Sequence, residues 1–203
     1  MMIAGIKMTY LIKSSEIKTF YVWINPKDFI ANHNSEIGSF FSMPQGNNND
    51  NLIFIPNPNF KGGFISPFQA NLLGSYIAEY NLEQHRMWYF NSYPSRLSAI
   101  FLFESKEDAK EYRKRNLDHV GKRVLKITES VGNYIYSKHD SSWIDFLRLP
   151  GWKDKDTIFN TCQAYWEGKR VIDCDLEHFG KKWSEGPIWE ILFNGKILFK
   201  VMG

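Results

Sequence analysis

The strongest structural signal of this chain lies in residues 189–201, Trp189-Glu190-Ile191-Leu192-Phe193-Asn194-Gly195-Lys196-Ile197-Leu198-Phe199-Lys200-Val201. Two short apolar runs flank Asn194-Gly195, and an Asn-Gly pair between large alternating apolar residues is the strongest short-range signal for a β-hairpin. We therefore expect two strands joined by a tight turn. Glu190 stands where the first strand begins, and a charged side chain at the mouth of a buried hairpin needs a physical reason.

The segments before this one alternate between strand and helix patterns. Runs of β-branched and aromatic residues predict strands at 17–24, 95–103, 124–127 and 134–137. Apolar residues at helical spacing, or a capping residue before a helical segment, predict helices at 66–86, 105–115, 141–147 and 158–166. Because the pattern has no strict βαβ order and no internal repeat, it predicts an α+β fold.

No linker divides the chain, so residues 1–203 are expected to form a single domain. Residues 27–68 are rich in Asn, Gly, Pro and Ser, and they predict an exposed excursion from the fold. Its most flexible part is expected at about 42–63, around the run Gln45-Gly46-Asn47-Asn48-Asn49-Asp50-Asn51. A loop of this kind beside a sheet often forms a lid.

The composition excludes several classes of protein. The net charge of +3, from 25 basic and 22 acidic residues, is too balanced for a nonspecific nucleic-acid binder by total charge. Two cysteines, Cys162 and Cys174, predict neither a disulfide framework nor a zinc site, and no metal is expected. The N-terminus lacks the pattern of a signal peptide or membrane span, so we expect a cytoplasmic protein with no membrane contact.

The end of the chain resembles the closing segment of mono-ADP-ribosyltransferases. The resemblance lies in Glu190-Ile191-Leu192, a turn with Gly195, and Phe199-Lys200-Val201. It implies an ADP-ribosyltransferase-like fold, with a mixed or antiparallel β core in two small sheets flanked by helices. It also implies that Glu190 is the catalytic residue, which holds the 2′-hydroxyl of the nicotinamide ribose and stabilises positive charge as nicotinamide leaves NAD, the co-substrate.

A second group of residues adds to the resemblance. Arg86, the segment 94–101, Tyr165-Trp166-x-Gly168 and the closing segment are together similar to an uncharacterised bacterial branch related to that fold. In transferases of the Arg-Ser-Glu type, a basic residue contacts NAD and hydroxyls brace the pocket. The implied NAD-binding residues are Arg96 and Arg86, which would hold the phosphates, Ser95 and Ser98, which would brace the pocket, and Tyr21, which would stack near nicotinamide.

Other interpretations of these residues stay open. Ser95 can simply shape the turn after Pro94, and Arg96 can pair with Asp145 or Glu104 at the surface. Glu167 is a rival catalytic carboxylate. His85, His119, His139 and His178 are scattered singly and are expected at the surface or in turns.

The chain also departs from the family pattern. The first core strand offers Tyr21 but no cation, and Ile188 replaces the acid or amide usually found two residues before the catalytic Glu. The acceptor, a protein or a nucleic acid, therefore stays open, as does a role as a toxin or phage-defence effector with a neutralising partner. The alternative is a noncatalytic nucleic-acid or protein-interaction module that uses the basic segment 106–126.

Overall fold

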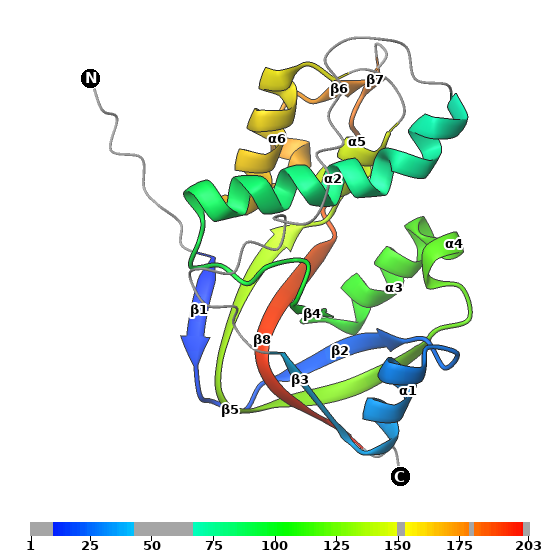
Figure 1. Cartoon of the computed structure of the whole chain (residues 1–203), viewed down its shortest axis with the longest axis vertical. Coiled ribbons are helices and arrows are strands. Elements are labelled where there is room, and N and C mark those ends of the chain that lie inside the picture. The colour runs from blue at the N-terminus through cyan, green and yellow to red at the C-terminus, as the bar shows by residue number, and fades with distance from the viewer. Residues whose placement is uncertain (1–9, 43–66, 150–152, 179–180, 201–203) are drawn as a thin grey trace.

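The computed structural model describes residues 10–42, 67–149, 153–178 and 181–200, which form a mixed α+β fold (Figure 1). Its strands are β1 (Leu11–Ser14), β2 (Thr19–Ile24), β3 (Ser39–Ser42), β4 (Ile100–Leu102), β5 (Val124–Asp140), β6 (Glu177–His178), β7 (Lys181–Lys182) and β8 (Trp189–Phe199). Its helices are α1 (Phe29–Glu36), α2 (Pro67–Tyr89), α3 (Lys106–Arg115), α4 (Leu117–Val120), α5 (Ser142–Arg148), α6 (Lys155–Trp166) and the 3-10 turn η1 (Val171–Asp173). The expected α+β class is confirmed.

A six-stranded antiparallel sheet is the centre of the fold. Its two long strands, β5 and β8, pair with each other along most of their length. The outer side of β8 pairs first with β4 and then with β3, and the outer side of β5 pairs with β2 and then with β1. Within the described residues the only other pairing is the short β6–β7 ribbon, so the expected division of the core into two small sheets is not seen.

The hairpin predicted at Asn194-Gly195 is wrong, because β8 continues straight through both residues. The partner strand bulges at this point: Val131 pairs with Lys196 and Ile135 pairs with Asn194, so three residues of β5 oppose Gly195 alone. A β-carbon on Gly195 would lie 2.6 Å from Cβ of Tyr134, and its φ is +146°. Glycine is therefore needed here because the two strands approach each other closely, and not because the chain turns.

The sheet curls until its two sides meet. Tyr21 of β2 and Phe103, the residue after β4, exchange backbone hydrogen bonds of 2.9 and 2.8 Å. The curve of β5 and β8 toward β2 and β4 can be followed in Figure 1. The concave side holds a buried apolar cluster made of Phe20, Val22, Ile24, Ile100, Leu102, Tyr134, Tyr136, Ile191, Phe193 and Ile197. Strand alternation leaves Glu190 and Leu192 on the opposite side.

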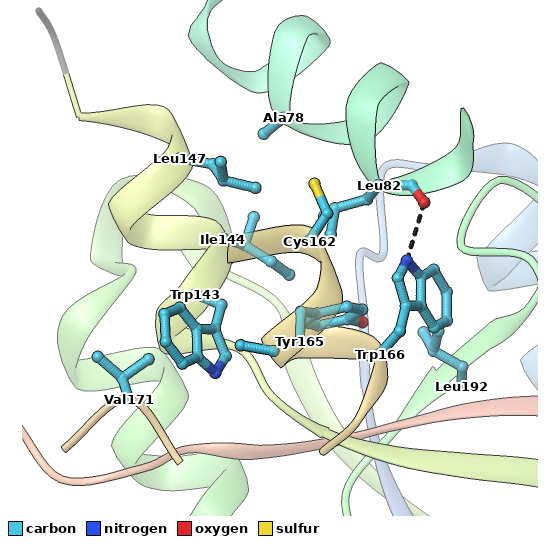
Figure 2. Close-up of a cluster of buried hydrophobic side chains, with 11 residues drawn as sticks. Ala78, Leu82, Trp143, Ile144, Leu147, Cys162, Tyr165, Trp166, Val171 and Leu192 are labelled. Atoms are coloured by element: carbon cyan, nitrogen blue, oxygen red, sulfur yellow. Dashed lines mark hydrogen bonds between the residues drawn. The ribbon is translucent and has the colours of Figure 1, made fainter. Parts of the chain in front are cut away.

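Helices α2, α5 and α6 cover that opposite side and form a second core (Figure 1). Each helix contributes residues at helical spacing, and Figure 2 shows them converging on Tyr165 and Trp166 of α6. The indole Nε1–H of Trp166 donates to the carbonyl of Leu82 in α2 over 2.8 Å, the dashed line in that figure. This bond satisfies a buried donor and fixes α6 against α2.

Helix α3 lies beside the sheet against a third, smaller cluster of Phe103, Ala109 and Ile188. The predicted N-cap is confirmed, because the hydroxyl of Ser105 accepts from the backbone N–H of Asp108 over 2.9 Å. The indole of Trp23 donates to the carbonyl of Ala109 over 3.0 Å and so holds the helix to β2. Helix α3 is thus fixed beside β2 (Figure 1).

Several predicted boundaries are corrected. Residues 27–42 were expected to be irregular, yet they contain α1, capped by Asp28, and β3, which pairs with β8. The strand expected at 95–103 is shorter and begins only at Ile100. The separate strands expected at 124–127 and 134–137 are parts of β5. Most of the excursion expected at 42–63 lies outside the described residues.

Candidate active site

Glu190, the second residue of β8, is buried in the layer between the sheet and the helices. Its side chain points to the helix side and is only 4 % exposed. The Arg96 guanidinium makes an ion pair with its Oε1, and the phenol of Tyr165 donates to the same oxygen over 2.6 Å. Within the described residues no hydrogen bond reaches Oε2. One carboxylate oxygen is thus held by two donors while the other is available.

Arg96 lies in a tight turn between α2 and β4, and Ser95 shapes this turn. The Ser95 hydroxyl accepts from the backbone N–H of Leu97 over 3.1 Å, and its carbonyl accepts from the N–H of Ala99 over 2.8 Å. This turn points the Arg96 side chain inward, between the rings of Phe101 and Tyr165, at 4.9 and 5.5 Å from their centres. The surface pairing of Arg96 with Asp145 or Glu104 is therefore not seen.

Every donor group of Arg96 is bonded. Nε and Nη2 donate to the two carboxylate oxygens of Glu79 in α2, over 2.7 and 3.0 Å, in a bidentate arrangement. Nη1 reaches Glu190 and also the hydroxyl of Tyr165, over 2.7 Å. One guanidinium therefore links a half-buried carboxylate of α2 to the buried carboxylate of Glu190 in β8.

These contacts set the protonation of the site. Burial raises the pKa of Glu190 above its ordinary value, and the Arg96 charge opposes this only in part. Burial alone would lower the pKa of Arg96, but the Glu190 and Glu79 carboxylates outweigh it and raise that pKa well above its ordinary value. Glu79 faces both Arg96 and Arg148, whose charges overcome its burial and lower its pKa. Glu190 is thus the easier of the two carboxylates to protonate.

His139 packs against Tyr165 and fixes the position of its ring. Its ring stacks on the Tyr165 ring with centres 4.5 Å apart, and its two nitrogens contact the Tyr165 carbonyl and the Ser137 hydroxyl over 2.9 and 2.8 Å. His139 is fully buried and burial lowers its pKa to about 3, so it stays neutral at pH 7. The expectation of a surface or turn position is wrong for His139 and for the buried His85.

Asp140 fixes the start of β8 relative to α5. This fully buried carboxylate accepts three backbone N–H groups, from Ser142 over 3.0 Å, Val171 over 2.9 Å and Ile188 over 3.1 Å. The three donors belong to α5, to η1 and to the segment that leads into β8. Glu190 therefore follows a rigidly anchored residue, which favours a fixed position for its side chain.

A cavity of about 230 Å³ opens at Glu190, in the cleft between α2 and α5 on one side and α3 and β2 on the other. Its charged wall consists of Glu79, Arg96, Arg123, Asp145, Arg148 and Glu190, and its apolar and ring-bearing wall of Trp23, Phe101, Phe103, Tyr112 and Ile144, with Ser141 at one end. Burial raises the pKa of Asp145 to about 6. The cavity combines flat apolar surface with charges of both signs, a composition typical of ligand sites.

A second cavity, of about 350 Å³, lies between α1 and the edge formed by β2 and β5. It is larger, but Glu36 and Lys126 are the only charged residues in its lining. Among the described residues its lining has no buried carboxylate. The cavity at Glu190 is therefore the better candidate for chemistry.

The structure brings together some of the predicted site residues and not others. Glu190 and Arg96 meet in the cavity wall, and Ser95 supports Arg96 from the turn. The Ser98 hydroxyl is buried without a hydrogen-bond partner among the described residues. Tyr21 packs on the cluster around Phe103 instead of lining the cavity, where Trp23 of the same strand lies.

Arg86 lies outside the cavity and closes the C-terminal end of α2. It bonds both carboxylate oxygens of Glu83, over 3.1 and 2.9 Å, and the carbonyls of Asn91 and Tyr93, over 3.2 and 3.1 Å. The rival carboxylate, Glu167, accepts from Gln163 over 2.6 Å, pairs with Lys169 and also lies outside. Both residues serve the ends of helices.

Sequence reasoning missed Glu79 and Arg148 as site residues. Glu79 lies three residues from Tyr76 and three from Leu82 on α2, and an acid on the same helix face as these residues was a usable signal. Nothing in the sequence separates Arg148 from other arginines at helix ends. Among the described residues no three His, Cys, Asp or Glu side chains gather in a way that would hold a metal ion.

Fold and site together define an α+β protein with a curled antiparallel sheet and a charged, ring-lined cleft at the start of β8. The chain belongs to a family that is described as a protein of unknown function, DUF2441, whose model matches residues 9–200. No curated protein matches the chain. None of the helices in the described ranges has the length and apolar character needed to cross a bilayer.

Proposed function

We propose that this protein consumes NAD as a mono-ADP-ribosyltransferase, with Glu190 as the residue that stabilises the reacting ribose. The observation that carries the proposal is the Glu190 carboxylate itself, which is buried in a cavity wall with Oε1 fixed by Arg96 and Tyr165 and Oε2 without a hydrogen bond among the described residues. An anion held in this way needs little rearrangement when positive charge develops beside it.

The chemistry follows from the charge that develops during transfer. When the bond between C1′ of the ribose and the nicotinamide nitrogen breaks, its electron pair goes to the nitrogen and positive charge develops on the sugar. Glu190 Oε2 would accept from the ribose 2′-hydroxyl and stabilise that charge more than the ground state. The acceptor nucleophile then bonds to C1′ and releases its proton to solvent.

The cavity walls suit one end of a dinucleotide. Trp23, Phe101, Phe103 and Tyr112 offer rings against which nicotinamide can pack. The volume of about 230 Å³ is below the roughly 300–1,000 Å³ of pockets that enclose a drug-sized ligand. Only the nicotinamide ribose end and the adjoining phosphates would then lie in the cavity, and the adenosine end of NAD would extend along the cleft.

The acceptor is a protein or a nucleic acid. A role as a toxin or phage-defence effector in the cytoplasm, with a neutralising partner, is part of the same proposal.

The second candidate function is noncatalytic binding of a nucleic acid or protein. It is favoured by one observation: Lys106, Lys110, Arg113 and Lys114 are all exposed on α3, at spacings that place them on one face. This candidate predicts salt-dependent binding and no NAD turnover.

The test is to incubate the purified protein with NAD labelled in its adenine half and a cell lysate, and to follow label transfer and nicotinamide release. Glu190→Gln keeps the size of the side chain and removes its charge, and Glu16→Gln is the matched control at an exposed position. We expect transfer by the wild type and the control and none by Glu190→Gln. Absence of NAD consumption by the wild type would refute the proposal, and label that survives Glu190→Gln would refute the role of Glu190.

A further inference from the structure

One face of α5 forms a wall of the cavity at Glu190. Ser141, at the N-cap position of the helix, lines the cavity together with Ile144, Asp145 and Arg148. These positions are three, four and seven residues apart, which places them on one side of a helix. The wall therefore has a hydroxyl at one end, a guanidinium at the other and a carboxyl between them.

Two of these residues carry buried polar groups that have no hydrogen-bond partner among the residues that the structure describes. The Ser141 hydroxyl and the Nε of Arg148 are both buried without a hydrogen bond, and Ser141 is only 2 % exposed. In the described part of the chain, Ser98 and Trp183 supply the only other buried side-chain atoms in this state. A buried donor left without a partner is destabilising, so two beside one cavity indicate a ligand that brings acceptor atoms.

The two arginines that the resemblance implies for the phosphates of NAD are already occupied. Arg86 is bonded to Glu83 and to two backbone carbonyls outside the cavity. Arg96 is bonded to Glu79, Glu190 and Tyr165. Either guanidinium would have to break buried ion pairs before it could bind a phosphate, and such pairs are strongly destabilising to break.

Arg148 makes fewer hydrogen bonds than Arg86 or Arg96 among the described residues. Within the described residues its one side-chain hydrogen bond is from Nη2 to Glu79 Oε1, at the long distance of 3.3 Å. Its side chain is 29 % exposed, so a ligand in the cleft can reach it. A guanidinium with unused donors in a fork suits a phosphate group, which accepts two parallel hydrogen bonds.

Asp145 lies between Ser141 and Arg148, and its carboxylate repels an anion when it is ionised. Because burial raises its pKa to about 6, protonation of its carboxyl is easier than for an exposed aspartate. A bound phosphate would favour the protonated form further, and that form donates a hydrogen bond. Ser141 and Arg148 are therefore the donors of this wall, and Asp145 adds a third donor only in its protonated form.

We infer that Ser141 and Arg148 form the phosphate subsite of this cavity and bind the pyrophosphate of a dinucleotide whose ribose end lies at Glu190. The identity of the ligand as NAD rests on the proposed function, whereas the phosphate chemistry of the subsite rests on α5 alone. The subsite assigns to Arg148 the contact that sequence reasoning gave to Arg86 or Arg96.

The experiment measures dissociation constants by titration calorimetry for ADP-ribose, which carries the pyrophosphate, for nicotinamide riboside, which carries no phosphate, and for inorganic pyrophosphate. The variants are Arg148→Gln and Ser141→Ala, with Arg170→Gln as the control, because Arg170 is exposed and pairs with Asp173 outside the cavity. We expect Arg148→Gln to weaken binding of ADP-ribose about 10- to 100-fold and Ser141→Ala about 3- to 10-fold. Nicotinamide riboside should change less than about twofold in both variants.

Thermal unfolding separates binding from a structural role. Removal of a buried hydroxyl that has no partner should leave the melting temperature of Ser141→Ala unchanged or higher, while the affinity for ADP-ribose falls. Equal loss for all three ligands, or no loss for ADP-ribose and pyrophosphate in either variant, would overturn the subsite. If pyrophosphate binds through Arg148 but neither NAD nor ADP-ribose binds, the subsite stands and the proposed function fails.

Discussion

The phenol of Tyr165 donates a hydrogen bond of 2.6 Å to Oε1 of Glu190, across the boundary between the helix layer and the sheet. The same hydroxyl accepts from Arg96 Nη1 over 2.7 Å, so it completes a chain of donors that ends on the carboxylate. Tyr165 itself is fixed by stacking on His139. The position of Glu190 therefore depends on a residue of α6 that never reaches the cavity surface, since Tyr165 is fully buried.

Replacing Tyr165 with Phe should test this dependence. The change removes the hydrogen bond that favours the charged carboxylate, so the pKa of Glu190 should rise further. If NAD is consumed as proposed, the acid limb of the pH profile of nicotinamide release should move to higher pH. We also expect a loss of about 1–3 kcal/mol in the free energy of unfolding.

Tyr89→Phe is the control for this variant, because Tyr89 is exposed on α2 and lies outside the cavity. Its pH profile and stability should match the wild type. An acid limb that stays in place in Tyr165→Phe would show that Tyr165 does not set the protonation of Glu190.

Arg96→Met should destabilise the protein strongly. The substitution leaves the buried Glu190 carboxylate without its cation, and it leaves the half-buried Glu79 carboxylate with Arg148 alone. Breaking a buried ion pair in this way costs about 3–5 kcal/mol, which urea denaturation measures directly. The double variant Arg96→Met with Glu190→Gln should recover part of that loss, since one unpaired charge is then gone. A loss below about 1 kcal/mol for the single variant would contradict the described network.

The pH dependence of stability should report Asp145. Its folded pKa of about 6 lies above its ordinary value of 3.8, so the folded state binds this proton more tightly than the unfolded state. The contribution of this proton to the stability of the fold is complete below about pH 4 and is lost as the pH rises through about 6. Asp145→Asn mimics the protonated form and should gain stability over the wild type across this window.

The gain at pH 7 is expected on the order of 1–2 kcal/mol, which is less than the full shift implies because Asp145 is partly exposed. Urea denaturation of both proteins at pH 4, 5, 6 and 7 is the measurement. A difference between variant and wild type that does not change with pH would rule out this assignment of the proton.

Gly195→Ala should distort the centre of the sheet. The added methyl group would lie 2.6 Å from Cβ of Tyr134, and the φ of +146° is unfavourable for alanine. We expect a loss of about 2 kcal/mol or more in the free energy of unfolding. Gly186→Ala is the matched control, because nothing lies within 4 Å of its new methyl group, and it should stay within about 0.5 kcal/mol of the wild type. Equal stability of the two variants would contradict the strand-crossing role of Gly195.

Local signals in the sequence predicted α2, α3, α5 and α6, although they missed α1. Ser105 with Glu107 and Asp108 in the first turn marked the start of α3, and Gly168 marked the end of α6, where it adopts a φ of +69°. These features depend on residues within one or two turns of each other. Helix propensity and helix capping act over that range, so the sequence alone is sufficient to predict these helix ends.

The sheet was harder to predict because its pairings are distant in sequence. Asn194-Gly195 has the local pattern of a hairpin, but β8 has partners in β5, β4 and β3 that supply more hydrogen bonds than a hairpin would. The three-residue bulge opposite Gly195 replaces the turn. Tertiary pairing overrode a local preference here, as it often does for strands.

The residues of the candidate site were likewise predicted only in part from the sequence. Glu190 and Arg96 were identified by resemblance, yet their shared partner Glu79 was not, because no local rule links α2 to β8. The partners of Arg96 lie 17, 69 and 94 residues away in the chain. Only the folded chain reveals that Arg86 is occupied at a helix end while Arg148 keeps unused donors.

The most direct test of the central claim is the rate of nicotinamide release by the purified protein at saturating NAD, for the wild type and Glu190→Gln, with NAD affinity measured in parallel. The account predicts that Glu190→Gln binds NAD within a few-fold of the wild type while its rate falls about 10²–10³-fold, the size of effect expected when a fixed charge at the transition state is removed. Equal rates in the two proteins, or no release by a wild type that binds NAD, would contradict it.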